Sequence, residues 1–188
     1  MTTEMPSPAQ GSCRVHVMNA AHLRELQAPL KARYKESPAS ALVTLTARGR
    51  VSQTDVTCVL ESSQGFTTAG LHRAAGGDGT AACSAVMLLE ALVGCAGVTF
   101  AAVSTAMGIE LGAATVVASG DLDFRGTLGV SKDAPVGFTS IDVTFTVDAV
   151  APPEKLEKLV QLTERYCVVF QTLAKPPTVV VKLAEPSA

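Results

Sequence analysis

The stretch Ser84–Met107, SAVMLLEALVGCAGVTFAAVSTAM, decides the fold of this chain. It is the longest apolar run in the sequence, and its single charged residue is Glu90. Gly108 follows it at the position where a residue of left-handed conformation ends many helices. A helix this apolar is typical of one that is buried inside protein. We therefore expect one long helix at the centre of the core.

The same run is long enough to raise the question of a membrane span. Residues 91–109 lack any charged side chain and, at 1.5 Å per residue, would cover the hydrocarbon core of a bilayer. They consist largely of Ala, Gly, Val, Ser and Thr, and no Lys or Arg flanks them as an anchor. Residues 1–13 have no basic region followed by an apolar run, so they do not resemble a signal peptide. We expect no membrane partner.

Strand and helix patterns flank this central run on its N-terminal side. Residues 19–35 carry Leu23, Leu26 and Leu30 at helical spacing, interrupted by Pro29. Alternation of apolar and polar residues then predicts a half-buried strand from residue 41 to residue 50. Two further runs, 56–60 and 66–69, predict a hairpin that continues the same sheet.

The C-terminal side continues this mixture of strand and helix. Residues 115–124 predict a strand, 125–137 a loop, and 138–147 the most regular strand of the sequence. A final amphipathic helix begins at Pro152-Pro153 and ends before Pro176-Pro177, and a last strand is expected at 178–183. The order predicts an α+β fold with antiparallel-rich sheets. We divide the chain into a tail and helix at 1–38 and one domain at 39–188.

Composition excludes several classes of function. The chain has 188 residues, 47% of them hydrophobic, which is enough to bury a core without disulfide or metal staples. Its 15 Lys and Arg against 17 Asp and Glu give a net charge of -2 without a basic stripe, so we expect no nucleic-acid partner. Five cysteines, an odd number with no Cys-x-x-Cys pair, argue against a secreted disulfide framework. A reducing, cytoplasmic location is expected.

Three familiar kinds of site are not supported by the motifs present. Cys13, His16 and His22 form the only close Cys and His cluster, and no second ligand pair stands at zinc-finger spacing. The GGDG turn at 76–79 lacks the Lys and Ser or Thr of a phosphate loop. Ser84 lacks the Gly-x-Ser-x-Gly context of a hydrolase nucleophile. We expect no metal and no organic cofactor.

Cys95 differs from these because it lies within the apolar run, between Gly94 and Gly97. Missing side chains on both sides would let another backbone or a small substrate approach the thiol. A free Cys in such a helix is more often a small core residue, and the same interpretation holds for Cys58 and Cys83. Reactivity would require a cationic partner to hold the thiolate, and Arg48, Arg50 and Arg165 are the candidates. Glu90 is five residues away, roughly 140° around the helix axis.

Several segments together resemble the OsmC/Ohr family of bacterial peroxide-defence proteins. They are GGDG at 76–79, MLLEALVGC at 87–95 with Thr99 after it, MGI at 107–109, GDLDF at 120–124, GFTSI at 137–141 and CVV at 167–169. Each segment is short, but together they follow the order of the family over residues 40–183. Two cysteines in two helices separated by two strands, Cys95 and Cys167, make this resemblance fairly specific.

The resemblance implies an intertwined homodimer whose sheets combine strands of both chains around long central helices. It also implies that Cys95 is the peroxidatic thiolate, which becomes a sulfenic acid, and that Cys167 is the resolving thiol. A dithiol reductant would reset the resulting disulfide. In the family an arginine of the N-terminal strands holds the thiolate, and we prefer Arg50 over Arg48 for this role.

Two positions depart from the family pattern. A proline commonly follows the second cysteine, but Val168 stands here. Many peroxidases of the family carry a carboxylate ten residues before the first cysteine, where this chain has Ala85, and Glu90 is the candidate replacement. The helix at 19–35 is an addition relative to the short Ohr type.

We therefore predict a thiol-dependent peroxidase that reduces organic hydroperoxides. The alternative is a protein that keeps the fold, has little peroxidase activity, and binds a small apolar ligand or a partner in the pocket at the dimer interface. The departures at Ala85 and Val168 favour the alternative, whereas the two cysteines favour the enzyme.

Overall fold

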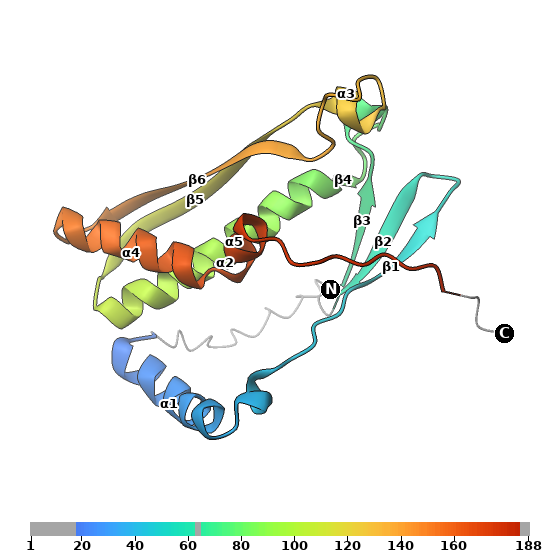
Figure 1. Cartoon of the computed structure of the whole chain (residues 1–188). Helices are drawn as coiled ribbons and strands as arrows, with labels where there is room; N and C mark the ends of the chain where they lie inside the picture. The colour runs from blue at the N-terminus through green and yellow to red at the C-terminus, as the bar shows by residue number, and fades with distance from the viewer. Residues whose placement is uncertain (1–17, 63–64, 185–188) are drawn as a thin grey trace, which may run out of the picture.

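The structure is a computed structural model that describes residues 18–62 and 65–184 (Figure 1). Two short 3-10 turns, Pro38–Ala41 and Arg73–Ala75, accompany the regular elements. The helices and strands follow in the order α1 (Ala20–Glu36), β1 (Arg48–Ser52), β2 (Thr57–Ser62), β3 (Gly65–Gly70), β4 (Ala82–Cys83), α2 (Ser84–Met107), β5 (Leu111–Leu122), α3 (Phe124–Thr127), β6 (Phe138–Ala149), α4 (Pro153–Tyr166) and α5 (Val168–Ala174).

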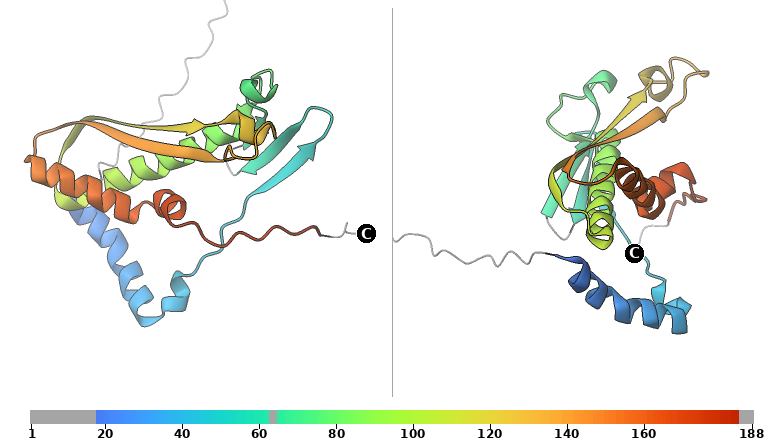
Figure 2. Two further views of the ribbon diagram at one scale, coloured as in Figure 1. Left: turned by 45° about the horizontal axis from the view of Figure 1, so that its top comes forward. Right: turned by 90° about the vertical axis from the view of Figure 1, so that its left-hand side faces the viewer.

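Two separate sheets make this an α+β fold. The first has the order β1-β2-β3-β4, antiparallel except for the parallel pair β3-β4, and the second consists of the long antiparallel pair β5-β6. Helix α2 runs along the β5-β6 sheet, and α4 and α5 lie beside it (Figure 1). The β1-β2 hairpin and α1 project away from this body (Figure 2).

Local sequence explains the two longest elements of the body. Helix α2 ends where expected because Gly108 adopts a left-handed φ of 66°, and its N–H donates to the carbonyls of Ser104 and Thr105. Strand β6 alternates as predicted: Ile141, Val143, Phe145 and Val147 pack toward the helices, while its polar residues face outward.

The core follows one stripe of α2. Leu92, Ala96 and Phe100 recur every four residues and are at most 4% exposed. The Phe100 ring stacks on the Phe145 ring of β6 at 4.6 Å between centroids. Leu159 of α4 completes this packing. The core thus lies between α2, the β5-β6 sheet and α4.

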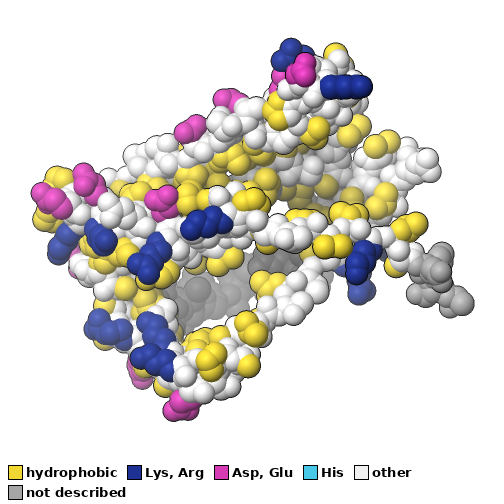
Figure 3. Space-filling model, viewed as in Figure 1, with side chains coloured by type: hydrophobic (Ala, Val, Ile, Leu, Met, Phe, Trp, Pro, Cys, Tyr) yellow, Lys and Arg dark blue, Asp and Glu magenta, His cyan; other side chains and the backbone are white. Residues whose placement is uncertain are grey.

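The rest of α2 stays uncovered within this chain. The helix is long and apolar enough to cross a membrane by length and composition alone. Only four of its 24 residues are buried, and Val98 is 74% exposed. Hydrophobic side chains also reach the surface along the seam between the β5-β6 sheet and the helices (Figure 3).

Helix α1 forms at 20–36, close to the predicted range. Asn19 caps it by accepting from the N–H groups of Ala21 and His22, and Pro29 lies inside the helix without ending it. None of its residues is buried.

Other predicted boundaries were wrong. The ladder of the first strand covers only Arg48–Ser52, and residues 42–47 before it have no strand assignment. The expected strand at 178–183 has none either. In both segments the pattern favours a strand, but the described part of the chain brings no neighbouring strand alongside.

Three smaller differences concern single elements. The predicted final helix is broken at Cys167 into α4 and α5. The predicted loop at 125–137 begins inside the short helix α3. The two-residue strand β4 was not predicted, because two residues are too few to show a period.

Candidate active site

Cys95 lies near the middle of α2, beside the buried stripe. It is partly exposed and packs against the core cluster that contains Leu92, Ala96 and Cys167. Gly97 is close to β5, since a Cβ built there would lie 3.4 Å from the Val116 side chain. The small residue therefore lets the strand approach the helix next to the thiol.

Cys167 belongs to both of the helices that meet at it. Its N–H donates to the Thr163 carbonyl at 2.9 Å and closes α4, while its own carbonyl accepts from the Gln171 N–H at 2.9 Å in α5. Its sulfur accepts from the Phe170 N–H at 3.5 Å, as a capping residue does. The Gln171 side chain also donates to the Glu164 carbonyl, which ties α5 back to α4. These contacts hold Cys167 in a position where the residue is 1% exposed.

The two thiols meet at this junction: Cys95 packs against the cluster that contains Cys167, and each thiol shifts the pKa of the other. The contact depends on two features of the chain. Helix α2 presents Cys95 next to its buried stripe, and the break between α4 and α5 turns Cys167 toward it. Among the predicted site residues, the structure thus brings Cys95 and Cys167 together. Thiols in contact can form a disulfide after oxidation of either one.

The environment lowers the pKa of Cys95. Burial acts against this by raising the pKa, but hydrogen bonds outweigh it. The donors are the backbone N–H groups of Val169 and Val168, the Cys167 thiol and the Thr99 hydroxyl. Cys95 is therefore the thiol more readily present as thiolate, the nucleophilic form.

The pKa of Cys167 moves in the opposite direction. Burial raises it first, and the neighbouring Cys95 raises it further by accepting the proton of Cys167 and by its negative charge. The N–H groups of Phe170 and Val169 offset part of this increase. Cys167 therefore stays protonated while Cys95 carries the charge.

None of the three candidate arginines contacts this pair within the described chain. Arg50 lies on β1, where its guanidinium is 3.5 Å from Glu61 and 6.0 Å from the centre of the Phe66 ring. Arg48 shares the same face of that strand, two residues away. Arg165 lies on α4 with its guanidinium 5.5 Å from the centre of the Tyr166 ring. Among the described arginines, none contributes to the pKa shift of Cys95.

Glu90 and Ala85 lie on α2 away from the thiols. Glu90 is exposed and makes no ion pair with any described residue. Ala85 is in the first turn of the helix. Neither residue takes part in the site as this chain forms it.

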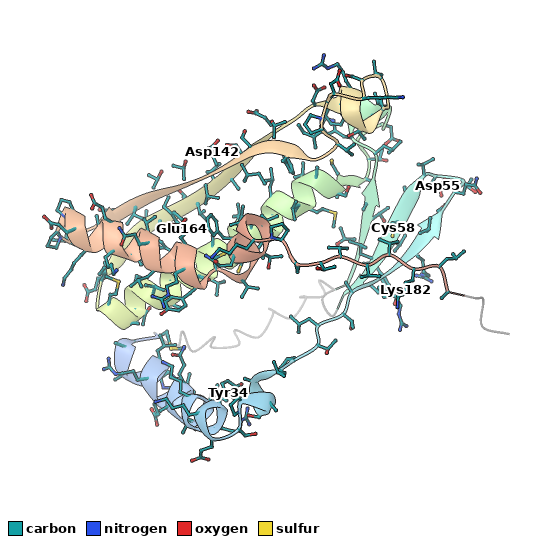
Figure 4. All side chains as sticks on the ribbon, viewed as in Figure 1. Tyr34, Asp55, Cys58, Asp142, Glu164 and Lys182 are labelled. Atoms are coloured by element: carbon teal, nitrogen blue, oxygen red, sulfur yellow. The ribbon has the colours of Figure 1, made fainter. Side chains whose placement is uncertain are left out.

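The remaining cysteines are separate from the pair. Cys58 lies on the sheet that contains β1 and β2, apart from the helices that carry Cys95 and Cys167 (Figure 4). Cys83 precedes α2. Cys13 and His16 lie outside the described residues, and His22 is 3.6 Å from Glu25. Within residues 18–62 and 65–184, no group of three or more His, Cys, Asp or Glu could hold a metal.

An apolar cavity of about 220 Å³ adjoins the buried sulfur of Cys167. Leu92 and Ala96 of α2 line one side, and Ile141, Val143 and Phe145 of β6 line the other. A second, wider cavity of about 540 Å³ shares Phe145 and Val160 with it.

Sequence reasoning missed the groups that lower the pKa of Cys95. Two of them are backbone N–H groups at the start of α5, and no side-chain pattern reveals them. Thr99 could have been found, because a Thr four residues after a Cys on a helix shares its face. Its hydroxyl also donates to the Cys95 carbonyl at 2.8 Å.

Known proteins with this fold include peroxide-resistance proteins. The structure is similar to an OsmC-like protein from Mycoplasma pneumoniae, with 13% identity, a TM-score of 0.60 and coverage of 71% of this chain and 89% of that one. An organic hydroperoxide resistance protein from Elizabethkingia anophelis gives 15% identity, a TM-score of 0.54 and coverage of 72% and 91%. The OhrB protein of Bacillus subtilis is also an organic hydroperoxide resistance protein. It gives 19% identity, a TM-score of 0.50 and coverage of 72% of this chain and 94% of that one.

Sequence comparison points the same way. No curated protein sequence matches this chain significantly. The family model described as OsmC-like protein matches residues 77–182, which is more than half of the chain and includes both thiols of the pair. The chain therefore belongs to the OsmC-like protein family.

Proposed function

We propose that this protein is a thiol-dependent peroxidase that reduces organic hydroperoxides. The observation that carries the proposal is the contact between Cys95 and Cys167, with the pKa lowered at the partly exposed thiol and raised at the buried one. A peroxidatic cysteine requires a nucleophilic sulfur that solvent can reach, and a resolving cysteine requires a protonated sulfur within reach of it. Each of the two thiols has the properties of one of these roles.

The reaction proceeds in two steps on the protein. The Cys95 thiolate attacks the outer oxygen of the hydroperoxide; the O–O bond breaks, the alcohol leaves after taking up a proton, and Cys95 becomes a sulfenic acid. The Cys167 sulfur then attacks the sulfenic sulfur, hydroxide leaves as water with the Cys167 proton, and a disulfide forms. A dithiol reductant returns both cysteines to the thiol form.

We further infer that the working form is an intertwined homodimer. Uncovered apolar surface on α2, and the two extended segments at 42–47 and 178–183, support it. In such a dimer the partner subunit would bring β1 near Cys95, and Arg50 or Arg48 would then supply the guanidinium that the thiol lacks within its own chain. Dithiol reductants and free cysteines fit a cytoplasmic location, which we also propose.

A second candidate function is ligand binding without turnover. The cavity beside Cys167 and the neighbouring one, which shares Phe145 and Val160 with it, favour this function, since the volume of the second, about 540 Å³, is in the range of small-molecule sites. In this alternative, the carboxylate absent at Ala85 and the proline absent at Val168 are groups that catalysis would have needed.

Hydroperoxide consumption by the reduced protein separates the two functions. With dithiothreitol as reductant, we expect tert-butyl hydroperoxide to be consumed faster than hydrogen peroxide. Cys95→Ser should abolish turnover, and Cys167→Ser should still form a trappable sulfenic acid at Cys95. Cys58→Ser is the matched control and should keep wild-type rates, because Cys58 lies on the other sheet.

If Cys95→Ser consumed hydroperoxide as fast as the wild-type protein, the proposed peroxidase activity would be contradicted. A sulfenic acid trapped at Cys167 in Cys95→Ser would reverse the two roles.

A further inference from the structure

The Glu164 carbonyl, near the end of α4, accepts from a side chain instead of from the backbone. In a continuous α-helix each N–H donates to the carbonyl four residues before it, so the Val168 N–H would donate to Glu164. Cys167 has an extended backbone, with φ -72° and ψ 111°, which interrupts this order. The Gln171 side chain donates to the Glu164 carbonyl through Nε2 at 2.9 Å. Its amide thus takes the place of a backbone donor.

Gln171 forms hydrogen bonds on both sides of the break at Cys167. Its backbone N–H donates to the Cys167 carbonyl at 2.9 Å, which begins the bonding of α5. Its side chain reaches back seven residues to α4. The same residue therefore joins the end of one helix to the start of the next.

The break frees two N–H groups, which serve the other thiol. Burial raises the pKa of Cys95, but the N–H groups of Val169 and Val168 act as donors to its sulfur and lower this pKa. A backbone N–H has a single proton, so Val168 serves either the Cys95 sulfur or the Glu164 carbonyl fully, but not both. A carbonyl left without its donor would compete with Cys95 for that proton.

We propose that Gln171 is a positioning residue for Cys95: by donating to the Glu164 carbonyl, its amide leaves the Val168 N–H to the Cys95 sulfur. Gln171 acts on Cys95 through the backbone of Val168. The inference deepens the proposed function, on which its importance for catalysis rests.

Packing limits how far the break could close without this amide. Val169 and Phe170 of α5 pack against the buried cluster that contains Cys167, so α5 keeps its place when one hydrogen bond is lost. Loss of the Gln171 amide should therefore redirect the Val168 N–H for part of the time. The expected effect on Cys95 has the size of one hydrogen bond.

A pH titration of the thiols tests the inference. The test uses reduced full-length protein in which Cys13, Cys58 and Cys83 are replaced by Ser, and ultraviolet absorbance of the thiolate measures ionisation without any reagent entering the site. Gln171→Met keeps the length of the side chain and removes its donors. It should lower the first acid dissociation constant of the thiol pair about threefold, the effect of one weak hydrogen bond. Gln161→Met, at an exposed position of α4, is the matched control and should titrate like the parent protein.

A second background separates positioning from stability. In Val168→Pro the N–H at residue 168 is absent, so the Glu164 carbonyl has no proton to take from Cys95. Gln171→Met should therefore change the titration little when it is added to Val168→Pro. An equal shift in both backgrounds would overturn the inference. A Gln171→Met protein that loses thermal stability but titrates like its parent would show a structural role only and would overturn it as well.

Hydroperoxide consumption, measured separately, distinguishes failure of the inference from failure of the proposed function. If Gln171→Met shifts the titration as expected but the parent protein consumes no hydroperoxide, the proposed function fails and the inference stands. If consumption depends on Cys95 but the titration is unchanged in Gln171→Met, the inference fails and the proposed function stands.

Discussion

Thr99 is the side chain that links the backbone of α2 to the reactive sulfur. Its hydroxyl donates to the Cys95 carbonyl at 2.8 Å and also reaches the Cys95 sulfur, where it lowers the pKa. A hydroxyl has a single proton, so it serves one of these acceptors at a time. Ionisation of Cys95 makes the sulfur the stronger acceptor, and the proton should move toward it.

Removing this hydroxyl should therefore raise the pKa of Cys95. Thr99→Val should slow alkylation of Cys95 by iodoacetamide at neutral pH about threefold, the effect of one hydrogen bond worth roughly 0.7 kcal/mol. The rates should converge at high pH, because both proteins are then fully ionised. Thr99→Ser keeps the hydroxyl and should follow the wild-type pH profile. A profile of Thr99→Val that coincides with wild type would rule out this contribution.

The two cysteines could be predicted from the sequence, whereas their partners could not. Cys95 and Cys167 lie in recognisable segments, so their residue types and order were enough to identify them. The lowered pKa depends on backbone N–H groups of Val168 and Val169, which every residue except proline carries. Glu90 stays a prediction: within this chain it is exposed and makes no ion pair with any described residue.

At the scale of elements, the break between α4 and α5 places the second thiol. The sequence predicted one amphipathic helix from Pro152-Pro153 to before Pro176-Pro177, with Cys167 near its apolar face. The break depends on the Phe170 N–H that bonds to sulfur and on the Gln171 side chain that bonds to the Glu164 carbonyl. A hydrophobic pattern does not predict hydrogen bonds of this kind, so it could not predict the break in the helix.

Val168 allows a test of this junction. Proline is well accepted in the first turn of a helix, and Cys167 has the extended ψ of 111° that a following proline requires. Val168→Pro should therefore fold, and the gain from a stiffer unfolded chain should be offset by the lost N–H contact, so its stability should stay close to that of the wild type. It also removes an N–H that donates to Cys95, so the pKa of Cys95 should rise and alkylation at neutral pH should slow.

Thermal unfolding and the pH profile of alkylation measure both effects, and Val168→Ala is the control that keeps the N–H. A lower pKa of Cys95 in the proline variant would contradict the assigned donor.

Helix α2 offers a pair of glycines with opposite expected behaviour. Gly108 ends the helix at a φ of 66°, so Gly108→Ala should destabilise the protein by about 1–2 kcal/mol. Gly94 lies in the helix interior with free space around it, so Gly94→Ala should stabilise by about 0.5–1 kcal/mol. Urea unfolding at one fixed protein concentration compares the two variants. Equal stabilities would show that backbone conformation does not decide where α2 ends.

At the scale of the whole molecule, the hairpin of 56–60 with 66–69 could be predicted, whereas two other expected strands did not form as predicted. The patterns at 41–50 and 178–183 favour strands, yet the structure pairs only the end of the first and none of the second. Alternation shows that a segment suits a sheet; it does not show which chain supplies the neighbour. The helices and strands of the body, α2, β5, β6 and α4, could be predicted from their periodicity, because the contacts that hold this body together lie within one chain.

The C-terminal segment provides a direct test of the proposed dimer. Light scattering should give the wild-type protein twice the chain mass of 19.4 kDa. Val181 is 91% exposed within one chain, and Val181→Glu should weaken the dimer because the charge would enter the covered face. Lys182→Glu alters the adjacent, already polar position and should leave the dimer intact. Wild-type protein that stays monomeric at micromolar concentration would refute the dimer.

A newly synthesised chain carries the uncovered face of α2 and the Val-rich segment at 178–183 into solvent. Exposed apolar surface of this kind engages chaperones and directs unpaired chains to degradation. Because the proposed dimer requires two chains to meet, its rate of assembly would depend on the square of the chain concentration, and halving synthesis would slow it about fourfold. The amount of mature protein in a cell should then fall more steeply than the dose of its gene.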